Sequence, residues 1–131
     1  MYGTMRVVRR DPFVRAVALL AGLLLVGFAL WAMLGPRSFF DHVATFPPFN
    51  RHLLHDIGVF QLGLGATLLF ALVWSEALLA ALAGNAIAAA SHVVSHVVDD
   101  DLGGRGIDIP LLSAFAAVIL LAALLRARPT R

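Results

Sequence analysis

Two histidines and a run of aspartates near the end of a long apolar stretch are the residues of this sequence best suited to chemistry. In the segment SHVVSHVVDDD, His92 and His96 are four residues apart, and Asp99 follows three residues later. On an α-helix these spacings place the three side chains on one face, one turn above the next. Imidazole and carboxylate groups are unfavourable at the edge of an apolar segment unless they have a partner. The spacing therefore indicates a polar helix face that could hold a metal ion.

The composition is that of a multi-pass membrane protein. The chain has 131 residues, of which 60% are hydrophobic and 14% charged, with a mean hydropathy of +0.88; soluble domains have about 45–50% apolar and roughly 25% charged residues. The length indicates a single domain. The absence of cysteine excludes disulfides, thiolate metal sites and thiol nucleophiles. All ten basic residues are arginines near the ends of apolar runs, which indicates membrane topology and argues against nucleic-acid binding.

Four apolar runs are long enough to cross a hydrocarbon core of about 30 Å, which needs roughly 20 helical residues. We predict an all-α bundle of four transmembrane helices over residues 13–34, 51–74, 77–98 and 108–125, within one domain covering 1–131. A cleavable signal peptide is the alternative for the first run. That run is longer than the usual apolar region of about 7–15 residues, and no clear cleavage site follows, so we favour a span.

Local signals predict where these helices begin and end. Asp11, followed by proline, is expected to cap the first span, and Asn50 is expected to cap the second. Gly35, also followed by proline, should end the first span. Asp108 is expected to cap the fourth span. Between the first two spans, residues 38–43 could form one interfacial helical turn.

The segment from residue 57 to 98 is too long for one crossing and must contain a turn. Trp74-Ser75-Glu76 combines a charge with an interfacial aromatic side chain, so we predict a tight hairpin there. Asn85 would then lie at mid-bilayer as a hydrogen-bonding group between helices, and Gly58, Gly63 and Gly65 would allow close helix packing.

The arginines orient the predicted bundle, because four spans put both termini on one side. Seven arginines flank the bundle on the side of the termini, and three lie on the opposite side: Arg6, Arg9, Arg10, Arg15, Arg126, Arg128 and Arg131 against Arg37, Arg51 and Arg105. Cytoplasmic loops are enriched in basic residues, so we predict both termini in the cytoplasm. All five histidines, including His42 in the first outer loop, then fall at the outer end.

This topology predicts a metal site at the outer end. Spans two and three, joined by a tight hairpin, are expected to be neighbours with axes roughly 8–10 Å apart. Imidazole and carboxylate groups on both would then converge and suit zinc, copper, nickel or non-haem iron. The candidate ligands are His52, His55, Asp56, His92, His96 and Asp99.

Three alternatives remain open on the sequence alone. A b-type haem could be held between His55 and His92. The clustered histidines could act as a pH switch for a neighbouring subunit. The protein could instead be an accessory subunit of a larger membrane complex or a homo-oligomer, with no chemistry of its own. No phosphate loop, dinucleotide fingerprint or recognisable nucleophile is present, so no catalytic residue is predicted and enzymatic activity stays open.

The segment FNRHLLHDIG at residues 49–58, followed by the His-x-x-x-His helix, resembles small four-span integral membrane proteins of actinobacteria. The overall plan is loosely similar to the DoxX-like four-helix membrane proteins. The match covers spans two and three. It implies a four-helix fold and a location in the bacterial inner membrane, and it supplies no activity or site residue.

Overall fold

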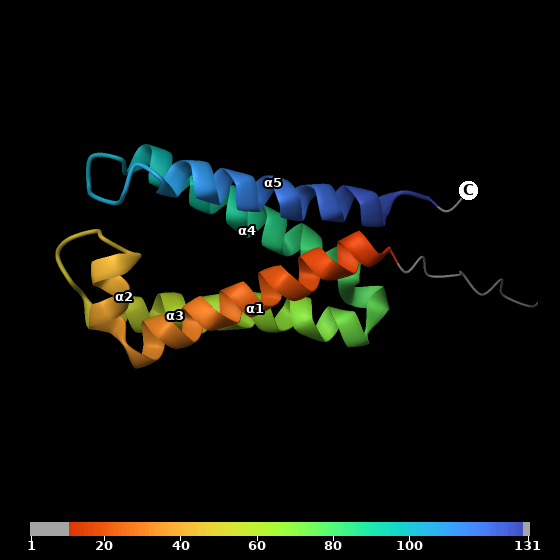
Figure 1. The fold of residues 1–131 in the computed structure, drawn as a ribbon, viewed down its shortest axis with the longest axis horizontal. Helices are drawn as coiled ribbons and strands as arrows, with labels where there is room; N and C mark the ends of the chain where they lie inside the picture. Colours follow the sequence, from red (N-terminus) through yellow and green to blue (C-terminus); the bar gives the residue numbers. More distant parts are fainter. Residues whose placement is uncertain (1–10, 130–131) are drawn as a thin grey trace, which may run out of the picture.

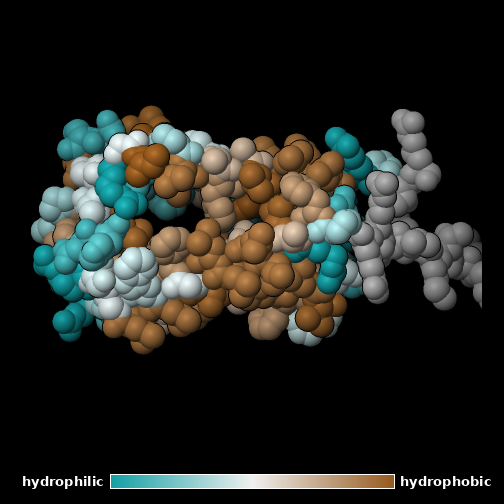
Figure 2. All heavy atoms as spheres, viewed as in Figure 1, coloured by the Kyte–Doolittle hydropathy of each residue, from teal (hydrophilic) through white to brown (hydrophobic). Residues whose placement is uncertain are grey.

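The computed structural model describes residues 11–129, and these are helical apart from short connections (Figure 1). The helices are α1 (Pro12–Leu34), α2 (Pro36–His42), α3 (Arg51–Val73), α4 (Leu78–Val98) and α5 (Asp108–Ala127), with a 3₁₀ turn η1 (Ser75–Ala77) before α4. The prediction of an all-α bundle with four helices long and apolar enough to span a membrane is confirmed. Figure 2 shows the corresponding apolar belt between two polar ends.

The ends of the long helices form where local chemistry favours them. The Asp11 carboxylate accepts hydrogen bonds from the amides of Phe13 and Val14, and the Asn50 side chain accepts one from Leu53, so both predicted caps are confirmed. These side chains satisfy amides that have no partner within the helix. Gly35 ends α1 as predicted.

Two of the three features predicted for the connections and their flanking helix ends are confirmed, and one is wrong. The interfacial turn is present as α2, which starts two residues earlier than predicted, and the hairpin turn lies at Ser75–Ala77. The predicted cap of the fourth span is wrong, because Asp108 is the first residue of α5 and its carboxylate accepts from the Arg105 amide instead.

The four long helices pack as two antiparallel pairs, α1 with α3 and α4 with α5 (Figure 1). Glycines bring α1 and α3 into backbone contact. A Cβ atom at Gly65 would lie 2.9 Å from the carbonyl oxygen of Gly22, and one at Gly58 would lie 3.0 Å from that of Ala29. Small residues allow this close approach in lipid. Gly63, by contrast, meets no atom within 4 Å, so its predicted packing role is not found.

Among residues 11–129, the two pairs share a core in the half of the molecule where α1 begins and α5 ends, which we call the inner end. The buried residues of this core come from all four long helices, and include Val14, Leu68, Leu82 and Ile119. Asn85 is also buried and donates hydrogen bonds to the Leu64 carbonyl and the Thr67 hydroxyl of α3, as its predicted role between helices requires.

Toward the opposite end, which we call the outer end, the pairs diverge. The second apolar cluster contains Ala32, Phe39 and Leu54 from α1, α2 and α3, and no residue from α4 or α5. Figure 2 shows the consequence, an opening through the molecule between the two pairs, nearer the outer end. At the inner end, Arg15 and Arg126 hold α1 and α5 to the hairpin by donating hydrogen bonds to the carbonyls of Leu72 and Ser75.

Candidate functional site at the outer end

All five histidines belong to the outer half of the molecule, but they lie on three helices. His42 ends α2, His52 and His55 lie in the first turns of α3, and His92 and His96 lie in the last turns of α4. Because α3 and α4 belong to different helix pairs, the histidines of these two helices are carried by elements that separate toward this end (Figure 1).

His92 and His96 form a close pair on α4. Their Nε2 atoms are 3.2 Å apart, and the ring centroids are 4.8 Å apart with planes inclined at 61°. The four-residue spacing stacks the side chains one turn apart. This distance allows one N–H···N hydrogen bond between the two rings, whose direction depends on the tautomer.

The pair faces the connection between α2 and α3. The His96 ring meets the Phe46 ring edge-on, with centroids 5.2 Å apart and planes at 84°. Phe46 lies in the loop between α2 and α3, so this face of α4 is directed toward the α1–α3 pair. The imidazoles are therefore not directed at the first turns of α3.

An arginine and a buried carboxylate lie beside the histidine pair. Asp108 is 6% exposed and accepts three hydrogen bonds from Arg105, one from its amide and two from its guanidinium, at 2.7–3.0 Å. The remaining guanidinium nitrogen donates to the carbonyl of His42 at 2.6 Å. The Asp108 carboxylate interacts electrostatically with both imidazoles. Arg105 thus joins the start of α5 to the end of α2.

Glycines let the loop between α4 and α5 approach the loop after α2. The Gly104 amide donates to the carbonyl of Thr45 at 3.1 Å. Gly103 and Gly104 have φ angles of 142° and 88°, which side-chain-bearing residues rarely adopt. A Cβ atom on Gly103 would lie 2.7 Å from the Thr45 oxygen. Together with the hydrogen bonds of Arg105, these contacts connect the two helix pairs at the outer end of the opening between them.

The other predicted ligands do not join the histidine pair. His52 Nε2 lies 3.5 Å from an Asp56 carboxylate oxygen, with side chains 86% and 51% exposed. His55 is half-buried on the same helix, and Asp99 caps the end of α4. Within residues 11–129, no group of three or more histidine, aspartate or glutamate side chains is arranged to hold one metal ion. The predicted convergence of six ligands from spans two and three is therefore not found.

The physical reason is that a tight hairpin forces two helices together only at the turn. Here α3 packs along α1 and α4 along α5, so the outer ends of α3 and α4 are free to separate. The haem alternative depends on the same proximity, since His55 and His92 lie on helices of different pairs. It stays a prediction without support from the packing.

Sequence reasoning did not single out Arg105 or Phe46. The three-residue spacing of Arg105 and Asp108 on either side of a helix start was a usable signal, because residues at this spacing can meet. Phe46 carried no such signal, since its neighbour His96 is far away in the sequence. Four arginines used to orient the bundle, Arg6, Arg9, Arg10 and Arg131, lie outside the described residues.

Comparison with family models, with curated proteins and with solved structures finds no match for this chain. The resemblance to small four-span actinobacterial proteins and to the DoxX-like plan therefore stays a prediction. Its four long apolar helices make the chain a multi-pass, four-helix membrane protein, and it carries a histidine pair near its outer end.

Proposed function

We propose that this membrane protein binds a divalent transition-metal ion near its outer end through the Nε2 atoms of His92 and His96. The observation that carries the proposal is the 3.2 Å separation of these two nitrogens. Two imidazoles bound to one tetrahedral zinc ion at about 2.0–2.1 Å each have nitrogens roughly 3.3 Å apart. The pair therefore has the ligand separation of a metal site.

The surrounding charge favours a cation. Asp108 interacts electrostatically with both imidazoles, and three further aspartates follow α4 at positions 99–101. Carboxylates at a helix C-terminus oppose the helix dipole, and a nearby cation offsets that repulsion. Imidazole nitrogen is a ligand suited to zinc, copper, nickel and iron. With two protein ligands, the remaining coordination positions are open to water or to a molecule that the ion polarises.

We further propose that the protein lies in a bacterial inner membrane with both termini in the cytoplasm. The distribution of arginines supports this orientation. The metal site then faces the periplasm or the cell exterior. A C-terminal fusion to an enzyme that is active only in the periplasm tests the orientation, and activity of that fusion would contradict it.

Metal analysis of protein purified without a histidine tag tests the proposed site. We expect about one ion per chain in the wild type and background levels in His92→Ala and His96→Ala. His52→Ala is the matched control, because His52 is an exposed helix-end histidine that pairs with Asp56 on its own helix. Its metal content should equal that of the wild type.

The pH dependence gives a second readout. Imidazole must lose its proton to bind a metal, so the affinity should fall as the pH is lowered from about 7.5 to about 5.5. No stoichiometric metal in the wild type, or equal loss in His52→Ala, would refute the proposal. A Soret band in the same sample would favour haem. Co-purifying partner chains with no metal would favour the accessory-subunit alternative.

A further inference from the structure

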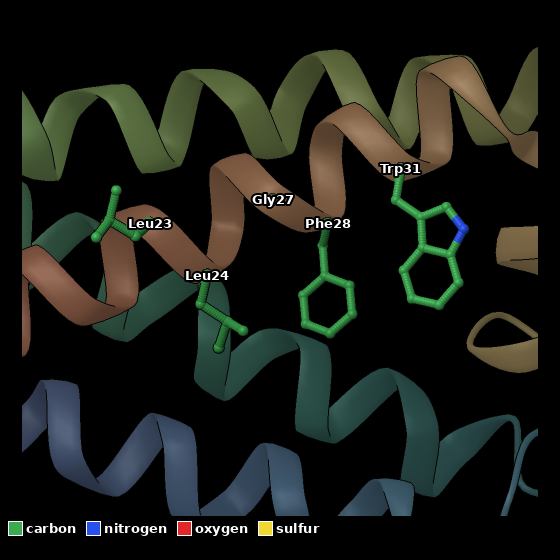
Figure 3. A pocket seen from close by; sticks show the side chains of 5 residues that line it. All are labelled: Leu23, Leu24, Gly27, Phe28 and Trp31. Atoms are coloured by element: carbon green, nitrogen blue, oxygen red, sulfur yellow. The ribbon is translucent and has the colours of Figure 1, made fainter.

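Within residues 11–129, the arginines and the acidic side chains all lie at or near the ends of the membrane-spanning helices. Two of these arginines belong to the inner end, Arg15 in the first turn of α1 and Arg126 in the last turn of α5. The ends of spanning helices lie at the level of the lipid headgroups. The outer half of α1 offers no such charge, because its open pocket is lined by apolar side chains and a glycine (Figure 3): Leu23, Leu24, Gly27, Phe28 and Trp31.

Arg15 and Arg126 reach the same hairpin from two different helices. The Arg15 guanidinium donates to the carbonyl of Leu72, and the Arg126 guanidinium donates to that of Ser75, both at 3.1 Å. These two acceptors are three residues apart, and three residues of chain span at most about 11 Å. The residue before each arginine packs in the same apolar cluster. The start of α1, the end of α5 and the hairpin therefore meet at one place (Figure 1).

Most of the hydrogen-bonding capacity of these two arginines is unused. A guanidinium has five N–H donors, and within residues 11–129 each of the two groups makes one hydrogen bond, to the hairpin. The Arg126 Nε atom is buried and has no acceptor. A buried donor on a charged group is unfavourable without an acceptor. This atom therefore marks the place of an acceptor that residues 11–129 do not supply.

The acidic side chains of the inner end do not neutralise the two arginines. These side chains are Asp11 and Glu76. Asp11 caps α1, and the ion pairs of residues 11–129 lie elsewhere, at the outer end. The residues outside this range include no aspartate or glutamate. The inner end therefore favours an anion that the acidic side chains of this chain do not provide.

We propose that Arg15 and Arg126 together bind one phosphate group at the inner end, whose oxygens accept from Arg126 Nε and from the remaining guanidinium N–H groups. Arginine suits phosphate because its planar N–H groups donate in pairs to two oxygens. Basic sites between membrane-spanning helices recognise phospholipid headgroups in this way, and inorganic phosphate offers the same oxygens. The bound group links α1 and α5 to the hairpin, and this site does not depend on the histidine pair at the opposite end.

Native mass spectrometry of the detergent-solubilised full chain tests this site, with dioleoyl phosphatidate as the probe. The wild type should bind one phosphatidate saturably. Dioleoylglycerol has the same acyl chains without the phosphate and should not bind saturably. Inorganic phosphate is then added to the phosphatidate complex to distinguish the two sources. Displacement of the lipid would assign the site to phosphate in general and retention would assign it to a lipid headgroup, and either result supports a phosphate site.

Variants of three arginines separate a built site from net charge. Arg15→Gln and Arg126→Gln should each weaken phosphatidate binding about tenfold or more, the worth of a hydrogen bond to a charged group. Arg128→Gln is the matched control, because Arg128 is an exposed arginine two residues after Arg126 and its loss changes the net charge equally. It should bind phosphatidate as the wild type does. Arg126→Lys keeps the charge but lacks Nε, so it should bind more weakly than the wild type.

Three results would overturn the inference. The first is no saturable binding of phosphatidate by the wild type, or equal binding of dioleoylglycerol, a readout that does not depend on the folding of any variant. The second is an equal loss of binding in Arg126→Gln and Arg128→Gln, which would reduce the effect to net charge. The third is wild-type affinity in Arg126→Lys, which would show that the buried Nε atom does not contact the phosphate.

Discussion

Single residues inside this protein show how polar groups are kept at membrane depth. Asn85 is buried, and its amide donates to carbonyls at Ala81 and Leu64 and to the Thr67 hydroxyl at 3.0–3.5 Å. Two of these acceptors lie on α3, so the side chain links the two helix pairs where they are still in contact. Without such partners an amide in hydrocarbon is strongly unfavourable. The sequence identified this role because Asn85 is an isolated amide in an alanine-rich span.

We therefore expect Asn85→Ala to destabilise the protein by about 0.6 to 2 kcal/mol, the range of interhelical hydrogen bonds in membranes. Equilibrium unfolding in mixed detergent and denaturing micelles measures this change. Ser91→Ala, at an exposed position on the same helix, is the control and should be near neutral. Equal stability of the two variants would contradict a linking role for Asn85.

The first and last residues of each helix could be predicted from the sequence far better than the helix against which it packs. Their ends depend on neighbours within a few residues, such as Asp11, Asn50 and Gly35, and these signals are visible in the sequence. The choice of packing partner depends on faces that are distant in sequence. Gly58 and Gly65 on α3, seven residues apart, match Gly22 and Ala29 on α1, which have the same spacing. In the folded protein this match lets α3 pack on α1, whereas connectivity alone suggested that α3 would pack on α4.

Gly65→Ala should separate α1 from α3. The new Cβ atom would lie 2.9 Å from the Gly22 oxygen and 3.0 Å from the Val26 nitrogen, both backbone atoms that cannot turn away. We expect a loss of about 1–3 kcal/mol, as for other overpacked sites, measured by the same unfolding titration. Gly63→Ala on the same helix meets no neighbour and should be neutral or slightly stabilising. A neutral Gly65→Ala would show that the helices are not in backbone contact.

The whole molecule is two helix pairs joined at both ends and separated between them. The inner end is joined by the four-helix core and by Arg15 and Arg126, and the outer end by Arg105 and the loop glycines. The predicted metal site assumed one compact bundle, and this is why its six ligands divide into two groups. The His92–His96 pair survives because its geometry is set within one helix.

The separation of the two helix pairs at the outer end decides which element the outer half of α4 faces, and a thiol cross-linking experiment measures this most directly. The chain has no cysteine, so introduced pairs react without background. With a short bifunctional thiol reagent, Phe46→Cys/His96→Cys should cross-link, since these rings are in contact at 5.2 Å. His52→Cys/His96→Cys should not, because α3 and α4 have separated at that end. Efficient cross-linking of positions 52 and 96, with none between 46 and 96, would contradict the account and restore a compact bundle.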